Sequence, residues 1–175
     1  GPGLARAIFE DFGKSLTELR VLILGAGGGA GRAIATQCAR EGSPAIYLSN
    51  RTIAKLETIT KSLTEEHGAK LVYTLSTDEK DLINAANRAD LIINSTSLGL
   101  HEDDILPLPV TALSARHRIY DAVYNPPVTP LLAEADKLGA KTSNGLSMLL
   151  HQGANSYSFW LGQEPNITAM RKGLG

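Results

Sequence analysis

A glycine-rich loop spans residues 25–31 (GAGGGAG), after an apolar run and before an alanine-rich stretch. This strand–loop–helix setting is the one in which glycines hold a dinucleotide. Gly25 permits the tight turn, Gly27 lets the backbone approach a pyrophosphate, and Ala30 is small enough for the helix to pack on the strand. The helix N-terminus adds free N–H groups and a positive dipole end. The loop therefore predicts nucleotide binding, with an ordinary tight turn as the alternative, and the extra glycines leave its register open.

The end of the following strand distinguishes two dinucleotides. NAD-binding folds usually place Asp or Glu about 20 residues beyond the glycines to bind the ribose hydroxyls, and no acid is present in 49–52 (SNRT). Arg51 carries a planar, permanent charge that suits a phosphate. Thr52 adds a hydroxyl, and Lys55 lies one helical turn further on. These groups favour an adenosine 2′-phosphate, and so NADP over NAD; the alternative is that both charges are simply solvated.

Short apolar runs alternate with longer amphipathic ones along the chain. The short runs predict strands at 20–24, 45–49, 70–73, 91–94, 118–121 and 141–144. Helices are expected at 29–40, 52–67, 78–86, 129–138 and 145–161, with Asp78 and Thr129 as N-caps, and the longest loop at 101–112. This alternation predicts one α/β domain over residues 1–175, a Rossmann-type, doubly wound, mainly parallel sheet with helices on both faces. A helix at 3–13 precedes the first strand, and we expect it to bridge to a part of the protein outside this chain.

Polar residues follow the last three predicted strands. The segments are 94–99 (NSTSLG), 121–127 (DAVYNPP) and 144–145 (NG). Ligands of open parallel sheets bind beyond the carboxyl ends of the strands. The final helix places Met148, Gln152 and Asn155 on one face. This convergence predicts a binding cleft, although each group alone is equally explained by helix capping, as at Asn144, or by surface polarity.

Composition restricts the class of partner. A net charge of −1 provides no general basic field for nucleic acid or an anionic membrane, and no apolar run reaches the roughly 20 residues that span a bilayer. Cys38 is the only cysteine, which excludes an internal disulfide and a cysteine metal cluster, and we interpret it as a small core residue. We expect no metal, no nucleic-acid or membrane partner and a cytoplasmic setting, and a homodimer remains open.

Taken together and in order, these segments resemble the C-terminal, NADP-binding domain of shikimate dehydrogenases over essentially the whole chain. The matching strings are 25–30 (GAGGGA), 50–52 (NRT) with Lys55, 94–99 (NSTSLG), 121–126 (DAVYNP), 129–132 (TPLL), 144–149 (NGLSML) and 152–154 (QGA). The stretch before Arg32 is one residue longer than the commonest form of the family, so the phosphate contacts could be shifted. The combination is far more specific than the glycine loop alone.

The resemblance implies a role for each matching position. It places the pyrophosphate on Gly25, Ala26, Gly27, Gly28 and Gly29, and the adenosine ribose phosphate on Asn50, Arg51, Thr52 and Lys55. It places Thr96 and Ser97 near the middle of the cofactor, and the nicotinamide against Ala122, Gly145 and Met148. It also directs Tyr124 and Gln152 toward the hydroxylated ring of the substrate.

The reaction that the resemblance implies is hydride transfer between NADPH and 3-dehydroshikimate, giving shikimate. In the family, a Lys–Asp pair in an N-terminal substrate domain serves proton transfer and substrate orientation. No residue of this chain matches that pair, so we expect no catalytic residue here and no turnover by the chain alone. Three alternatives stay open: a quinate/shikimate dehydrogenase that uses NAD, a related two-domain enzyme such as a methylenetetrahydrofolate dehydrogenase, and a free-standing NADP-binding module. The Asn50–Thr52 string argues against NAD, and Tyr124 and Gln152 argue against a folate substrate.

Overall fold

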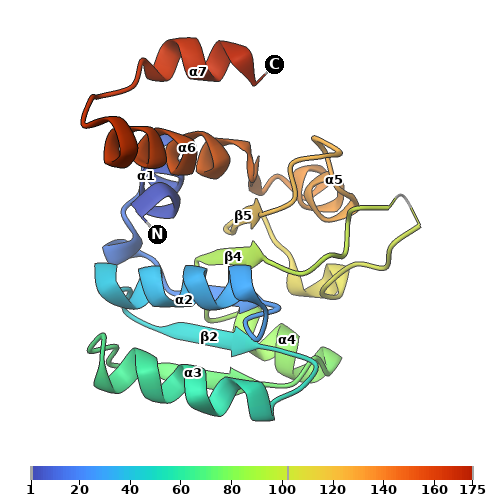
Figure 1. Cartoon of the computed structure of the whole chain (residues 1–175). Helices are drawn as coiled ribbons and strands as arrows, with labels where there is room; N and C mark the ends of the chain where they lie inside the picture. Colours follow the sequence, from blue (N-terminus) through green and yellow to red (C-terminus); the bar gives the residue numbers. More distant parts are fainter. Residues whose placement is uncertain (1, 102, 175) are drawn as a thin grey trace.

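The computed structural model describes residues 2–101 and 103–174; Gly1, Glu102 and Gly175 lie outside this range. Six strands form one fully parallel sheet in the order β3-β2-β1-β4-β5-β6, with helices packed on both faces (Figure 1). The strands are β1 (Val21–Leu24), β2 (Ile46–Ser49), β3 (Val72–Leu75), β4 (Leu91–Asn94), β5 (Arg118–Asp121) and β6 (Lys141–Asn144). The helices are α1 (Pro2–Phe12), α2 (Gly29–Glu41), α3 (Ala54–Glu65), α4 (Glu79–Ala86), α5 (Pro130–Lys137), α6 (Leu146–Leu161) and α7 (Ile167–Gly173), with short 3-10 turns at Leu16–Glu18 and Val110–Ala112. The predicted fold class is confirmed.

The sheet separates two apolar cores. One core lies between the sheet and α1, α2 and α3, and includes Ile34, Leu56 and Tyr120. The other lies between the sheet and α4 and α5, and includes Leu82 and Leu131. Strands β1 and β4 are apolar and buried along nearly their whole length, because central strands of a parallel sheet are covered on both faces.

The order of the strands places a crevice at one edge. Strands β1 and β4 are neighbours at the centre, and the connections that leave them run to opposite sides of the sheet. Ligands of doubly wound sheets bind at this reversal, beyond the carboxyl ends of the strands. Leu24 and Asn94 pair in register at those ends, so the segments that follow them form the two walls of the crevice.

Several predicted boundaries differ from the structure. Strand β3 lies two residues later than predicted, because its pairing with β2 sets Ile46 opposite Val72. Helix α3 begins at Ala54, and neither α7 nor the 3-10 turns were predicted. Asp78 precedes α4 but makes no side-chain cap; the Asp78 N–H instead donates to Ser76 Oγ at 3.0 Å. Thr129 does cap α5, accepting from the N–H of Leu132.

Helix α1 packs on α6 as part of the core (Figure 1). Leu4, Ile8 and Phe12 are buried, whereas Phe9 keeps 64% of its surface exposed. The predicted bridging role of this helix stays a prediction. Cys38 is buried as predicted. Across residues 2–101 and 103–174, no helix has the length and apolar character that a membrane crossing requires.

Candidate cofactor-binding site

The glycine loop joins β1 to α2 in a tight turn that requires glycine at two positions. Gly25 adopts a positive φ of 79°, and a Cβ there would lie 2.8 Å from Thr96 Cγ2. A Cβ on Gly31 would lie 2.4 Å from Gly25 O and 2.7 Å from Ala26 Cα. Gly31 is therefore the residue that lets the helix pack on the strand, and the assignment of this role to Ala30 is wrong, since Ala30 is exposed.

The backbone N–H groups of the loop divide into two sets. The N–H groups of Gly25 and Ala26 both donate to Ser49 O, and that of Gly28 donates to Gly25 O. These bonds fix the shape of the loop, and Ala26 is fully buried. The first turn of α2 begins at Gly29, and its N–H groups have no acceptor within the helix, as at any helix N-terminus. Those amides and the positive end of the helix dipole would hold an anion.

A cavity of about 720 Å³ lies at the carboxyl edge of the sheet, beside this loop. It brings together most of the predicted cofactor residues: Gly25, Gly27, Gly28, Asn50, Arg51, Thr52, Lys55, Thr96 and Ser97. The predicted long loop supplies another wall, formed by residues 105–109. The end of β2 contributes no carboxylate to the lining of this cavity. The acidic residue in the lining is Glu79, which lies at the start of α4.

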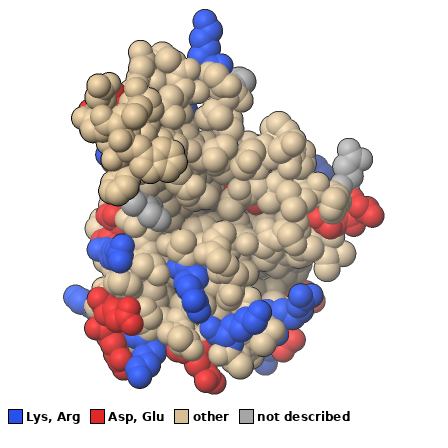
Figure 2. Space-filling view, in the orientation of Figure 1, with Lys and Arg blue, Asp and Glu red and all other residues tan. Residues whose placement is uncertain are grey.

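A second cavity, of about 390 Å³, lies on the other side of the loop, where α2 and α3 begin. Gly29 lines it, together with Gly27, Gly28 and Lys55. Arg32 and Thr58 also line it, although the sequence did not mark either as a site residue. Figure 2 shows Lys and Arg side chains gathered across the lower part of this face, toward the start of α2 and α3. The cations that flank the loop thus come from two helices.

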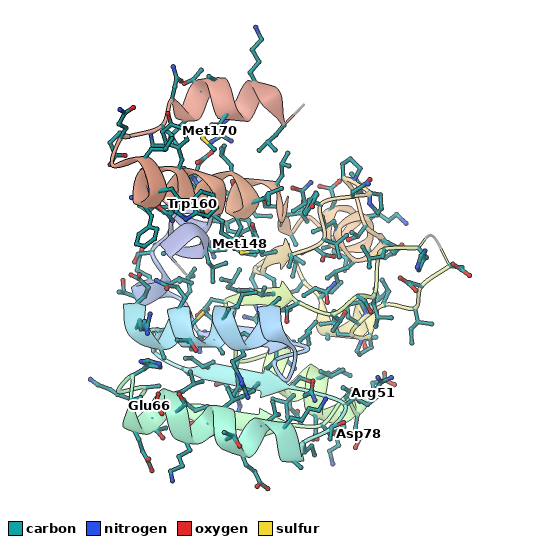
Figure 3. The ribbon with its side chains drawn as sticks, in the orientation of Figure 1. Arg51, Glu66, Asp78, Met148, Trp160 and Met170 are labelled. Carbon is teal, nitrogen blue, oxygen red and sulfur yellow. The ribbon has the colours of Figure 1, made fainter. Side chains whose placement is uncertain are left out.

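Asn50 joins the two phosphate-binding segments. Its Oδ1 accepts from the N–H of Gly27 at 3.2 Å, and its Nδ2 donates to Thr52 O at 2.9 Å. Asn50 therefore fixes the spacing between the glycine loop and the start of α3. Arg51 is exposed and stands at the edge of the molecule beyond β2, where its guanidinium faces solvent (Figure 3). An exposed guanidinium can bind a phosphate through charge-assisted hydrogen bonds.

A buried network fixes the ends of β4 and β5. Asp121 is fully buried and accepts hydrogen bonds from Asn94 Nδ2 (3.0 Å), the Val123 N–H (3.0 Å) and Thr129 Oγ1 (2.7 Å). Burial raises the pKa of Asp121, and the three donors oppose that shift. Asn94 Oδ1 in turn accepts from the backbone N–H and the hydroxyl of Thr96. This network sets where Thr96 stands at the crevice.

The predicted nicotinamide contacts lie further along the same edge. A Cβ on Gly145 would lie 2.2 Å from Ala122 O, so the start of α6 presses against the end of β5. Met148 is partly buried against the core, and Tyr124 keeps 45% of its surface exposed. Ala122, Gly145, Met148, Tyr124 and Gln152 do not line the large cavity, and their roles stay predictions. Gly145 is the N-cap residue of α6, and Asn144 just before it accepts from the N–H of Leu146 and donates to Pro127 O, so its side chain has a structural role in the turn.

The strand order, the glycine turn and the cation-lined crevice define the class: a Rossmann-type domain of the dinucleotide-binding kind. Residues 3–102 match the family model "Shikimate / quinate 5-dehydrogenase", and residues 145–173 match "Shikimate 5'-dehydrogenase C-terminal domain". The first match covers more than half of the chain. The chain therefore belongs to the shikimate/quinate 5-dehydrogenase family, as its sequence motifs predicted.

Individual relatives agree with this assignment. The chain is 36% identical over 173 residues to the shikimate dehydrogenase (NADP(+)) of Geobacter metallireducens, which covers 98% of this chain and 60% of that protein. The Thermus thermophilus enzyme, solved with NADP(H) and shikimate, superposes with a TM-score of 0.78 at 32% identity, over 99% of this chain and 60% of that one. A 5-ketofructose reductase of Gluconobacter superposes with a TM-score of 0.82 at 31% identity, over 99% and 61%. The chain thus spans about 60% of the length of its relatives.

Proposed function

We propose that this chain is the NADP(H)-binding domain of a shikimate dehydrogenase. The observation that carries the proposal is the set of groups at the end of β2. Arg51 and Lys55 line the cavity there beside the glycine loop. The end of β2 has no carboxylate of the kind that binds the ribose hydroxyls of NAD. The 2′-phosphate of NADP would pair with both cations, whereas NAD, which lacks this phosphate, would leave both cations without an anionic partner.

The shape of the crevice fits a dinucleotide. A Cβ on Gly25 would clash with Thr96 at 2.8 Å and one on Gly27 with Asn50 at 2.7 Å, so only glycine lets the loop lie this close to the two segments that line the cavity with it. The free amides at the start of α2 would bind the pyrophosphate, and Arg51, Thr52 and Lys55 the adenosine phosphate. When bound, the cofactor would supply the hydride for reduction of a carbonyl. The protein would then have to position the nicotinamide and the substrate.

The substrate we propose is 3-dehydroshikimate, which NADPH and one proton would convert to shikimate and NADP⁺. The support is the family membership together with Tyr124 and Gln152, whose sequence motifs match positions that the resemblance directs toward the hydroxylated ring. We further propose that proton transfer depends on a Lys–Asp pair outside this chain. Lys14 does not replace that lysine, because it is paired with Glu18 at 2.7 Å next to α1. The chain alone should bind cofactor without turnover.

Substitution of Arg51 tests the cofactor assignment. Arg51→Asp should weaken NADP⁺ binding about 10- to 100-fold, the equivalent of one or two charge-assisted hydrogen bonds, and should change NAD⁺ binding little. Lys61→Asp is the matched control, since Lys61 is a cation of α3 that pairs with Glu65 near the far end of the helix from Arg51. Equal losses for NADP⁺ and NAD⁺ would refute recognition of the phosphate by Arg51. Shikimate oxidation by the chain alone would refute the need for external catalytic groups.

A further inference from the structure

Helix α1 holds the start of α6 through one carboxylate. Asp11 Oδ2 accepts a hydrogen bond from Ser143 Oγ of β6 at 2.7 Å and from Ser147 Oγ of α6 at 2.6 Å. The two serines lie on either side of the turn between β6 and α6. Both bonds are short and have an ionised acceptor, so they rank among the stronger hydrogen bonds of a protein.

The same chain of bonds reaches β5. Tyr120 is fully buried and its hydroxyl lies 3.4 Å from Ser147 Oγ. Ser147 has a single hydroxyl proton and donates it to Asp11, so Tyr120 is the donor in this longer contact. Burial raises the pKa of Tyr120 to about 12, which keeps that proton in place at neutral pH. Asp11 thereby connects α1, β5, β6 and α6.

The turn that Asp11 fixes carries the closest backbone contact of the site. Gly145 lies in this turn, and a Cβ there would lie 2.2 Å from Ala122 O. The Gly145 N–H donates to Val123 O at 3.3 Å. A small displacement of the β6–α6 turn would therefore move Gly145 and Met148 relative to the end of β5.

From this connection we propose that Asp11 is a positioning residue for the nicotinamide half of the cofactor. The proposal rests on the function proposed above, because Gly145 and Met148 are the expected nicotinamide contacts. Asp11 lines neither of the two cavities beside the phosphate-binding loop, and its side-chain bonds go to β6 and α6 instead. It should thus influence where the nicotinamide sits and leave the adenosine phosphate site unchanged.

The neighbouring Glu10 provides a matched control. Glu10 also joins α1 to the C-terminal helices: His151 Nε2 lies 2.8 Å from its carboxylate, and Arg171 of α7 pairs with it as well. These contacts lie further along α6, away from the turn at Gly145. Glu10→Ala removes a carboxylate from the same helix and loosens the same helix pair, but leaves both bonds of Asp11 in place.

The test compares two ligands of the chain by calorimetry. NADPH engages both halves of the site, and adenosine 2′,5′-bisphosphate engages the phosphate half alone. Asp11→Ala should weaken NADPH about three- to tenfold, the loss expected from a displaced turn that no longer has its charge-assisted bonds. It should leave adenosine 2′,5′-bisphosphate binding unchanged. Asp11→Asn keeps an acceptor oxygen and should restore most of the difference, and Glu10→Ala should leave the ratio of the two affinities as it is.

Each outcome separates the positioning role from simpler ones. Equal weakening of both ligands by Asp11→Ala, or an equal change of the ratio in Glu10→Ala, would show a general structural role and overturn the proposal. Unchanged affinities for both ligands in Asp11→Ala would overturn it as well. Failure of the unsubstituted chain to bind either ligand would overturn the proposed function itself, and that result is distinguishable from all of these.

Discussion

Gly31→Ala is a single methyl group added where the structure has no room for it. The new Cβ would lie 2.4 Å from Gly25 O and 2.8 Å from Ser95 Oγ, whereas ordinary contact begins at 3.4 Å. Two of the three nearest atoms belong to the backbone of the glycine loop, so no side chain can rotate to relieve the clash. Helix α2 would have to move about 1 Å away from β1, which is an overpacking defect.

The size of that defect sets the expected measurements. Overpacking of a close-packed core costs about 1–3 kcal/mol, and for a domain of this size each 1 kcal/mol lowers Tm by roughly 2–4 °C. The first turn of α2 would move with the helix, so its amides would no longer converge on the pyrophosphate. Loss of one hydrogen bond to a charged phosphate costs about 1.5–3 kcal/mol, which is at least about tenfold in affinity. We therefore expect a Tm lower by roughly 3–10 °C and at least about tenfold weaker NADP⁺ binding.

Gly29→Ala is the matched control on the same helix. A Cβ on Gly29 would meet nothing within 4 Å, and its φ is not in the left-handed region. Replacing this glycine should raise stability by about 0.4–1 kcal/mol, because alanine loses less backbone entropy on folding. Thermal unfolding and calorimetric titration of the two variants provide the comparison. If Gly31→Ala kept both the Tm and the NADP⁺ affinity of the unsubstituted chain, the close approach of α2 to β1 could not be what positions the loop.

Three further predictions concern other parts of the site and its support. Arg32→Ala should weaken NADP⁺ about threefold or more, as loss of one exposed phosphate contact would, whereas Arg40→Ala at the other end of α2 should have no effect in the same titration. Asp121→Ala should lower the free energy of unfolding by about 3 kcal/mol, because three buried donors lose their acceptor; a urea titration that shows less than about 1 kcal/mol would refute this. The hydrogen bond from Arg20 lowers the pKa of Asp90, so the pair stabilises the fold above the ordinary Asp pKa of about 3.9 and the effect is lost as pH falls through the folded value. Asp90→Asn should thus cost at most about 1 kcal/mol at pH 7 and almost nothing near pH 2, whereas a cost independent of pH would contradict the ion-pair explanation.

The central strands were predictable because their residues face apolar layers on both sides. Strands β1 and β4 are short, buried runs of mainly apolar residues, and glycine or turn residues lie close to each run. Such a pattern is typical of a central strand of a parallel sheet. The edge strand β3 was displaced by two residues, since only its two end residues, Val72 and Leu75, are partly buried and the pairing with β2 sets its register. Helix α7 has no buried residue, so its sequence has no apolar period to detect.

The site was predictable where the chemistry is local in the sequence. The glycine loop and the Asn50–Thr52 string each stand within a few residues, and the structure joins them through the bond between Gly27 and Asn50. Roles that depend on orientation were not predictable. The choice between Ala30 and Gly31 depends on which face of α2 packs on β1. The orientation of α2 about its axis also places Arg32 at the second cavity. The bonds of Asp11 join residues 132 and 136 positions apart, so no local pattern could reveal them.

The central claim is that the end of β2 recognises a 2′-phosphate. The most direct measurement is the ratio of NADP⁺ to NAD⁺ affinity for the unsubstituted chain, by calorimetry at one fixed salt concentration. The two ligands differ only in that phosphate, and Arg51, Thr52 and Lys55 lie at the end of β2, where we expect it to bind. We predict that NADP⁺ binds at least tenfold more tightly, a difference of about 1.4 kcal/mol or more. Equal affinities, or tighter binding of NAD⁺, would contradict the account.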